Sequence, residues 1–411
     1  MLIVALLGTC DSKLEELLYL RARILEEDCD VILIDVGRSP AKHEAITISQ
    51  TDVCNSAKND VQVDRLPRGE LIKYMTKQAT IVVKKLFNDG KIHGIIAAGG
   101  SGGTSLVAPI MREALPIGFP KLIVSTVASG DTGPLVGECD ITMMYSVVDI
   151  AGSNSLLHDI FDNAAAAIVG MSKAYSRRKQ GFVRQPTAKR VGITMFGVTT
   201  PCVDVARKCL EDKGYEVYVF HATGHGGIAM ERLVNEGRLD AVLDITTTEI
   251  CDHLMGGVMS AGPLRLEAAA KAGIPYVLSA GAMDMVNFGP RATVPEKFQH
   301  RKLYEHNPTV TLMRTNKDEC RQVGAFMAQK LRKFRKYPEL VKVVCPVGGV
   351  SLLSVDGAPF ADEDANAALF GAISLGLADD PIEVVRDERD INDATFAVDI
   401  AERLHTLMVS S

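Results

Sequence analysis

The sequence contains no tryptophan, few aromatic residues and no excess of basic charge. Aromatic residues make up 5% of the 411 residues, and the formal net charge is −6. Nucleic-acid binding relies on clustered lysine and arginine for the phosphates and on aromatic platforms for the bases. The composition therefore argues against a nucleic-acid-binding protein.

Long hydrophobic runs are also missing. A membrane-spanning helix needs about 20 apolar residues, and no stretch approaches that length. The opening segment, MLIVALLGTCDSK, lacks a basic flank and has a short apolar run, so it predicts a buried strand rather than a signal peptide. The nine cysteines are scattered singly, which is typical of reduced thiols that pack as small hydrophobes. We expect a cytoplasmic protein that does not insert into a membrane.

The chain contains enough apolar residues to form more than one hydrophobic core. Apolar residues reach 47%, and at about 150 residues per domain the length predicts two or three domains. Short apolar runs alternate with helical patterns, which is typical of buried parallel strands joined by helices in a doubly wound α/β sheet. In the first half the expected strands are 2–7, 31–36, 94–98, 122–127 and 141–148.

The same alternation restarts after a polar segment. Residues 176–190 are basic, contain proline and have little apolar content, so they predict a linker between domains 1–180 and 190–411. The expected strands of the second half are 191–196, 217–220, 241–246, 276–280, 310–313, 341–346 and 382–385. The predicted helices are 14–25, 71–87, 104–113, 155–176, 203–213, 228–236, 264–272, 317–334 and 393–408.

A glycine-rich stretch, AAGGSGGTS at 97–105, follows one of these strands and opens a helix. Glycines let the backbone approach a ligand closely, and the free N–H groups of a helix start attract an anion. The stretch is neither a Walker A loop nor a strict G-x-G-x-x-G fingerprint. We therefore interpret it as an anion-binding loop, with a tight turn capped by Thr104 as the structural alternative.

Two further loops follow strands of the first half. In GTCDSK, Lys13 is a candidate phosphate partner and Asp11 a candidate partner for a ribose or Mg²⁺, although Asp11 or Ser12 can equally cap the helix. After the fourth strand, Asp131 and Asp140 are candidate Mg²⁺ ligands, and the alternative is that each is an ordinary turn residue.

Titratable and amide side chains follow the strands of the second half. Side chains at the carboxyl ends of parallel strands are placed to act as acids, bases or ligands, so we take these as catalytic candidates. They are His221, His225, Glu249, Asp284 and Asn287. His221 and His225 lack a third ligand fixed by sequence, which disfavours a metal site, and His225 can instead meet an anion at a helix start. Cys202 near a helix start is more simply a packing residue than a reactive thiol.

Several strings, in the right order along nearly the whole chain, resemble the family named for the tomato-mosaic-virus resistance protein. They include GTCDSK, AAGGSGGTS, VSTVASGD, TMFGVTTPCV, VFHATGHGG, DITTTE and MDMVNFGP. The resemblance implies two Rossmann-like subdomains, ATP and Mg²⁺ bound by the first, and a homodimer. In the plant protein a TIM-barrel-like domain follows, which here would be a separate polypeptide or absent.

Carried over motif by motif, the resemblance implies a nucleotide site made of three loops. Its residues are Gly8, Thr9, Asp11, Gly99, Gly100, Ser101, Gly102, Gly103, Thr104, Ser125, Thr126, Ser129, Gly130 and Asp131, with Asp131 as the metal candidate. The function that we expect is an ATP-dependent enzyme, a transferase or ligase, acting on a small polar metabolite in a ligand cleft between the subdomains. The alternatives are a non-catalytic, nucleotide-gated binding protein and an ATP-independent hydrolase or isomerase.

Overall fold

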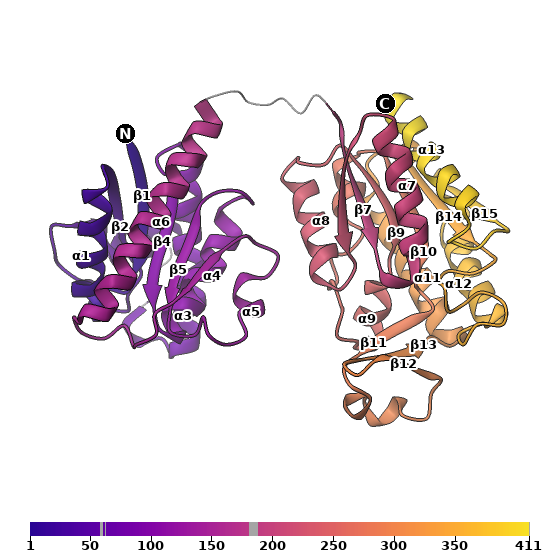
Figure 1. Cartoon of the computed structure of the whole chain (residues 1–411), viewed down its shortest axis with the longest axis horizontal. Helices are drawn as coiled ribbons and strands as arrows, with labels where there is room; N and C mark the ends of the chain where they lie inside the picture. The colour runs from indigo at the N-terminus through magenta and orange to yellow at the C-terminus, as the bar shows by residue number, and fades with distance from the viewer. Residues whose placement is uncertain (58–60, 62, 181–187, 411) are drawn as a thin grey trace. The chain divides into compact units, whose positions relative to one another are not determined.

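The computed structural model describes residues 1–57, 61, 63–180 and 188–410, which fold into two compact units. Unit 1 spans Met1–Gln185 and unit 2 spans Pro186–Ser411. Each unit has a six-stranded parallel sheet between helices (Figure 1), which confirms the predicted α/β class with mostly parallel sheets. Residues 181–187 of the expected linker lie outside the described residues.

Unit 1 is built on a sheet with the strand order β3-β2-β1-β4-β5-β6. The chain builds outward from β1 to β3 and then places β4 on the other side of β1, so the strand order reverses between β1 and β4. The strands are β1 (Leu2–Gly8), β2 (Cys29–Asp35), β3 (Ile46–Ile48), β4 (Gly94–Gly99), β5 (Lys121–Ser125) and β6 (Thr142–Tyr145). The helices are α1 (Cys10–Glu26), α2 (Gln50–Cys54), α3 (Arg68–Asn88), α4 (Ser101–Ala114), α5 (Gly133–Val136) and α6 (Ser155–Gln180).

The two faces of this sheet carry separate apolar cores, which explains why its strands show no polar alternation. On β1, Val4 and Leu6 belong to the core that contains residues of α1 and α6. Their neighbours Ala5 and Leu7 belong to the core that contains residues of α3 and α4. All four side chains are fully buried, as expected for a parallel strand with helices on both faces.

Unit 2 has a parallel sheet with the order β15-β14-β10-β9-β7-β8, and its strand order reverses between β7 and β9. Its strands are β7 (Arg190–Met195), β8 (Glu216–His221), β9 (Ala241–Thr246), β10 (Tyr276–Gly281), β14 (Val341–Pro346) and β15 (Glu383–Asp387). Its helices are α7 (Thr200–Asp212), α8 (His225–Asn235), α9 (Glu249–Met255), α10 (Ala268–Ala272), α11 (Lys317–Phe334), α12 (Glu363–Gly376) and α13 (Ala394–Ser410). None of the helices that the structure describes has both the length and the apolar character needed to cross a membrane.

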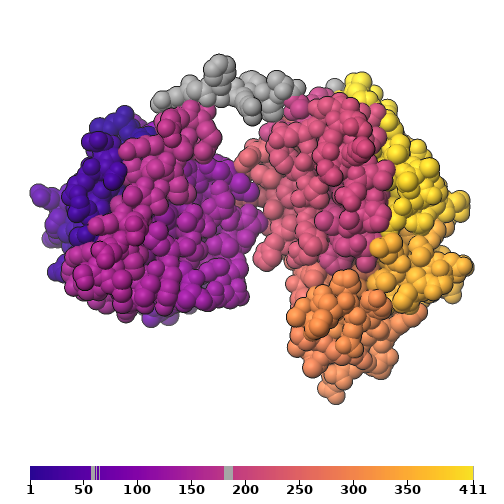
Figure 2. Space-filling model, viewed as in Figure 1, coloured from indigo at the N-terminus to yellow at the C-terminus, as the bar shows by residue number. Residues whose placement is uncertain are grey.

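A small antiparallel sheet extends unit 2 beyond its parallel sheet. Strand β13 (Val310–Arg314) pairs with β11 (Met285–Phe288) on one side and with β12 (Leu303–Asn307) on the other. The orange segment in Figures 1 and 2 shows this sheet at one end of the unit. The run 310–313 is therefore a strand, as predicted, but it does not continue the parallel alternation. An apolar run does not reveal the direction of its partners, and the exposed, polar β12 gave no strand signal.

Two predicted elements are shorter than expected because the backbone leaves the regular conformation. The strand expected at 141–148 ends at Tyr145, since Val147 has a φ of 61°. The helix expected at 264–272 begins at Ala268, since Leu266 has a φ of 73°. In both cases a non-glycine residue adopts a left-handed conformation that sequence propensity does not predict.

Candidate functional site

A cavity of about 770 Å³ opens at the carboxyl edge of the unit 1 sheet. It lies where the strand order reverses, which is the usual ligand position in open α/β sheets. Its walls come from the segments after β1, β2, β4, β5 and β6 and from the start of α3. The lining residues are Thr9, Asp11, Ser12, Lys13, Val36, Arg38, Arg68, Leu71, Ile72, Gly100, Ser101, Gly102, Gly103, Leu106, Thr126, Tyr145, Val147, Val148 and Asp149.

The glycines of the loop after β4 differ in the space around them. A Cβ at Gly99 would come within 3.2 Å of the Gly103 Cα, so this glycine permits tight packing of the strand end against α4. A Cβ at Gly103, by contrast, would meet no atom within 4 Å. Helix α4 begins at Ser101, and its first-turn N–H groups have no partner within the helix. The open part of the loop therefore offers backbone donors to the cavity.

Thr104 and Ser125 were expected in the nucleotide site, but both side chains are fully buried. Their hydroxyl oxygens lie 2.7 Å apart, which joins the first turn of α4 to the end of β5. Neither residue lines the cavity. The capping alternative for Thr104 is wrong, because the N-cap of α4 is Gly100. The buried hydrogen bond between Thr104 and Ser125 therefore stabilises the glycine loop without contacting the cavity.

Asp11 lines the cavity and also organises the loop after β2. Its Oδ2 accepts hydrogen bonds from the backbone N–H groups of Arg38 (2.8 Å) and Ser39 (3.0 Å). Helix α1 begins at Cys10 with Thr9 as its N-cap and has no side-chain cap bond. The alternative that Asp11 or Ser12 caps this helix is therefore wrong.

Two arginines that sequence reasoning missed line the same cavity. Arg38 follows β2, and Arg68 is the first residue of α3. The Arg68 guanidinium lies over the glycine loop, because a Cβ at Gly102 would be 2.5 Å from its Nη2. Lys13 is the third cation of the lining, and its Nζ donates to the Ile150 carbonyl. Both arginines come from segments outside the three predicted loops, so the loop motifs alone do not reveal them.

Part of the expected nucleotide site lies outside the cavity lining. A Cβ at Gly8 would collide with the Leu17 side chain, so this glycine serves the packing of α1. Asp131 accepts a hydrogen bond from the Gly133 N–H at 3.0 Å. Residues of the expected set that do not line the cavity are Gly8, Gly99, Thr104, Ser125, Ser129, Gly130 and Asp131.

Asp140, one of the aspartates proposed as Mg²⁺ ligands, is engaged by other residues of the protein. Asp140 pairs with the buried Lys121 at 2.7 Å and accepts from the Gly118 N–H, so it is a structural residue. Burial opposes its ionisation, but the hydrogen bond and charge of Lys121 outweigh burial and lower its pKa. In the described part of the chain, no three His, Cys, Asp or Glu residues are grouped to hold a metal ion.

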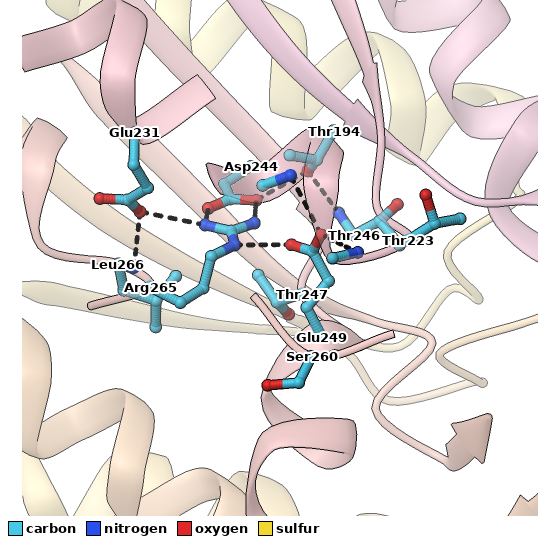
Figure 3. A network of polar contacts seen from close by, with 12 residues as sticks. Thr194, Thr223, Glu231, Asp244, Thr246, Thr247, Glu249, Ser260, Arg265 and Leu266 are labelled. Atoms are coloured by element: carbon cyan, nitrogen blue, oxygen red, sulfur yellow. Dashed lines mark hydrogen bonds and ion pairs between the residues drawn. The ribbon is translucent and has the colours of Figure 1, made fainter. Parts of the chain in front are cut away.

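Unit 2 contains a buried ionic network at the corresponding edge of its sheet (Figure 3). Arg265 is 1% exposed and donates to both carboxylate oxygens of Asp244, at 2.6 and 2.7 Å. Its Nε donates to Glu249 Oε2 at 2.8 Å, and its Nη1 lies 3.4 Å from Glu231 Oε1. Tyr276 and Thr194 donate to the Asp244 carboxylate as well. Such a network fixes the loops that it joins.

Unit 2 also has a glycine-rich turn, at Gly224, Gly226 and Gly227, and the buried Glu249 side chain lies inside it. Its Oε1 accepts from the N–H groups of Gly224 (2.7 Å) and Gly227 (3.0 Å) at the start of α8. Burial raises the pKa of Glu249, and the positive charge of Arg265 opposes that rise. The anion expected near His225 is therefore the protein's own carboxylate. His225 is the first residue of α8, and it is exposed to solvent.

Asp284 and Asn287, the other two buried catalytic candidates, also form hydrogen bonds within the protein. Asp284 Oδ2 accepts from the Ser351 hydroxyl at 2.8 Å, and burial raises the Asp284 pKa. Asn287 donates its backbone and side-chain N–H groups to the Asp252 carboxylate at 2.6 and 2.7 Å. Cys202 is fully buried, and burial raises its pKa to about 12, so it packs as a small hydrophobe.

His221, another of the catalytic candidates, lines a cavity of unit 2. It is the last residue of β8, and its ring borders a cavity of about 210 Å³. Most of its lining residues are apolar, and the polar ones include His306 and Asn307 of β12. Its full lining is Phe196, Gly197, Val198, His221, Thr223, Met259, His306, Asn307, Val310 and Leu312. No sequence signal linked β8 to β12, because the two strands belong to different sheets.

Two doubly wound units, each with its candidate site at the carboxyl edge of a parallel sheet, define a two-domain Rossmann-like α/β protein. The N-terminal domain of the uncharacterised protein family UPF0261 matches residues 2–177, and the C-terminal domain of that family matches residues 188–408. The chain therefore belongs to the UPF0261 family.

Related proteins match nearly the whole chain. A UPF0261 protein from Clostridium tetani is 44% identical over 407 residues, which are 98% of each chain. The ToMV susceptible protein tm-1(GCR26) and the ToMV resistance protein Tm-1(GCR237) of Solanum lycopersicum are each 39% identical over 416 residues. These matches confirm the resemblance to the resistance-protein family. They cover 95% of this chain but 54% of each tomato protein, so the chain spans about half the tomato proteins' length.

Solved structures align only distantly with this chain. MurG from Acinetobacter baumannii covers 68% of this chain and 79% of its own, with a TM-score of 0.25 and 14% identity. A UDP-GlcNAc 2-epimerase from Neisseria meningitidis covers 68% of this chain and 82% of its own, with a TM-score of 0.23 and 9% identity.

Proposed function

We propose that this chain binds ATP with Mg²⁺ in the unit 1 cavity and uses it in a reaction on a small polar metabolite. The observation that carries the proposal is the open glycine loop, whose first-turn N–H groups border a cavity of about 770 Å³. Helix starts with free N–H groups are natural phosphate sites. The volume lies in the usual range for small-molecule sites, about 300–1,000 Å³.

The charges of the cavity support a nucleoside triphosphate rather than a neutral ligand. Lys13, Arg38 and Arg68 line it, against the carboxylates of Asp11 and Asp149. ATP carries about four negative charges near neutral pH, so a divalent ion would supply the charge that these residues leave unbalanced. Mg²⁺ commonly takes one or two protein carboxylates together with phosphate oxygens. Asp149 is then the better placed carboxylate, because Asp131 is not part of the lining.

Isothermal titration of the purified full chain with Mg-ATP tests this first part. We expect saturable binding with one nucleotide per chain, and weaker binding when a chelator removes Mg²⁺. The absence of any heat or thermal-shift response to Mg-ATP at millimolar concentration would contradict nucleotide binding.

The second part of the proposal concerns the metabolite. His221 is an exposed imidazole beside a small cavity, which suits a general acid or base acting on a bound molecule. Glu249, Asp284 and Asn287 are fully buried and hydrogen-bonded, so we assign them to positioning this edge of the sheet rather than to proton transfer. His225 is exposed but does not line the cavity.

A metabolite-consumption assay tests this second part without a known substrate. The full chain is incubated with ATP and a pooled metabolite extract, and losses are followed by mass spectrometry. We expect His221→Ala to lower turnover by about 10²–10⁴, the usual contribution of a positioned acid or base. His225→Ala is the matched control and should retain activity. If wild-type protein binds ATP but consumes no metabolite, a nucleotide-gated binding protein replaces the enzyme.

A further inference from the structure

The chain leaves β6 through a strained turn. The Val148 N–H donates to the Ser146 carbonyl at 2.6 Å, which closes a three-residue turn around Val147. Val147 has a φ of 61°. Three-residue turns with a positive central φ are rare and strained, and a β-branched residue in that region is a clear outlier. Strain of this kind clusters at functional sites.

The surrounding structure holds the turn in place. Ser146 is fully buried, and its N–H donates to the carbonyl of Ser125 at the end of β5 at 3.2 Å. The Ser146 hydroxyl donates to the Val148 carbonyl at 2.6 Å. The strained conformation is therefore anchored to the sheet rather than left to the free end of a loop.

The turn presents two apolar side chains to the unit 1 cavity. Tyr145 is 42% exposed and Val147 is 56% exposed, and both line the cavity. Of the other apolar residues of the lining, Val36, Leu71 and Leu106 are buried in the core, and Ile72 and Val148 are partly buried. Tyr145 and Val147 thus offer more accessible surface to a ligand than the other apolar residues of the lining.

The strand order separates Tyr145, at the end of β6, from the glycine loop and the two arginines. The glycine loop follows β4, and β6 lies two strands away, which is about 10 Å at the usual strand spacing. Arg38 follows β2, on the opposite side of β4, and Arg68 lies over Gly102. The glycine loop, Arg38 and Arg68 therefore supply N–H donors and positive charge on one side of the cavity, and Tyr145 and Val147 supply accessible apolar surface on the other. The chain continues from Val147 to Asp149 and to the Ile150 carbonyl, which accepts from Lys13.

We propose that Tyr145 and Val147 form the base subsite of the nucleotide, with the triphosphate directed towards the glycine loop and the arginines. The planar base would stack on the Tyr145 ring and contact the Val147 side chain. The strained turn is retained because it holds Val147 against the base. This inference rests on the proposed nucleotide binding and adds the direction in which the nucleotide lies.

The test compares Mg-ATP with Mg-tripolyphosphate, which has the phosphates but no base. Both ligands are titrated into wild type, Tyr145→Leu and Val147→Gly, with Tyr304→Leu as a control at an exposed tyrosine of unit 2. We expect Tyr145→Leu to weaken ATP about tenfold or more and to leave tripolyphosphate unchanged, because base stacking alone is lost. Tyr304→Leu should change neither affinity.

Val147→Gly provides a second readout that a merely structural role would not give. Glycine adopts a positive φ without strain, so the melting temperature should stay equal or rise while ATP affinity falls. If Tyr145→Leu and Val147→Gly weaken both ligands equally, or weaken neither, the base subsite is wrong although nucleotide binding stands. If wild type binds tripolyphosphate as tightly as ATP, the base subsite is also wrong. If wild type binds neither ligand, the proposed nucleotide binding itself fails, and the base subsite with it.

Discussion

Glu249 and Gly227 lie so close that no side chain fits between them. A Cβ added at Gly227 would be 2.0 Å from the Glu249 Oε2. The glycine-rich turn of unit 2 is thus shaped around an internal carboxylate, whereas the Cβ position at Gly103 in the turn of unit 1 is open. The glycine-rich turns of the two units therefore have different structural roles.

Gly227→Ala should destabilise unit 2 although alanine favours helices. Helix propensity alone would stabilise the variant by about 1 kcal/mol. Because the new methyl group would displace a buried ion pair, we expect a net loss of about 1–3 kcal/mol in unfolding free energy. Chemical denaturation measures it. Gly371→Ala in α12, where a Cβ meets no atom within 4 Å, is the control and should be neutral or stabilising. Equal stability of the Gly227→Ala variant and wild type would contradict the contact.

The Asp252 carboxyl group should make unit 2 less stable as pH rises towards neutrality. Burial raises its pKa to about 7, with hydrogen bonds from Asn287 opposing the rise. A pKa raised above the unfolded value of about 3.9 gives stability that is complete below pH 4 and lost as pH approaches 7. The melting temperature of wild type should therefore fall between pH 5 and pH 8.

Asp252→Asn removes this titrating group and should flatten that part of the pH profile. The Asn287 Oδ1 is buried and has no partner in the described residues, so it can accept from an amide at position 252. Asp204→Asn, at an exposed site on α7, is the control and should keep the wild-type slope. Parallel profiles for wild type and the Asp252→Asn variant would show that Asp252 does not titrate in this range.

The sequence predicted the class of fold well because buried parallel strands leave a strong signal. Runs such as 94–98 and 122–127 correspond closely to β4 and β5. The antiparallel sheet was missed because β12 is short and exposed, with the pattern LYEHN. Strand direction depends on partners that are distant in the chain, so local pattern cannot give it.

The candidate site was only partly predictable for a related reason. The glycine loop could be found because its residues are contiguous. Arg38 and Arg68 reach the cavity from other segments, and only the folded sheet brings them beside Gly102. Conversely, Glu249 resembled a catalytic group because a strand-end carboxylate looks the same in sequence whether it faces a ligand or Arg265.

Arg68→Gln should weaken Mg-ATP binding. Its guanidinium lies over the glycine loop, where it can pair with a phosphate, and hydrogen bonds to charged groups contribute about 1.5–3 kcal/mol. We expect the affinity measured by titration to fall by about tenfold or more. Arg65→Gln is the control, because Arg65 is exposed but does not line the cavity. If the two variants behave alike, Arg68 does not contact the nucleotide.

The metal should depend on Asp149 more than on Asp131. Asp149 lines the cavity, and Asp131 does not. With excess Mg²⁺, Asp149→Asn should weaken ATP binding, whereas Asp131→Asn should have little effect. Repeating both titrations in chelator should abolish the difference between Asp149→Asn and wild type. A larger effect from Asp131→Asn would show instead that the loop after β5 holds the metal.

The open glycine loop of unit 1 is the proposed binding site for the phosphates of ATP. Gly102→Val tests this site most directly, because the atoms nearest to the added Cβ belong to the flexible end of Arg68 and the new side chain would block the loop. Gly170→Val, at an exposed site on α6 with no atom within 4 Å of its Cβ position, is the matched control. Isothermal titration with Mg-ATP should show binding by wild type and Gly170→Val and little or none by Gly102→Val. Unchanged affinity in a well-folded Gly102→Val variant would show that the phosphates bind elsewhere.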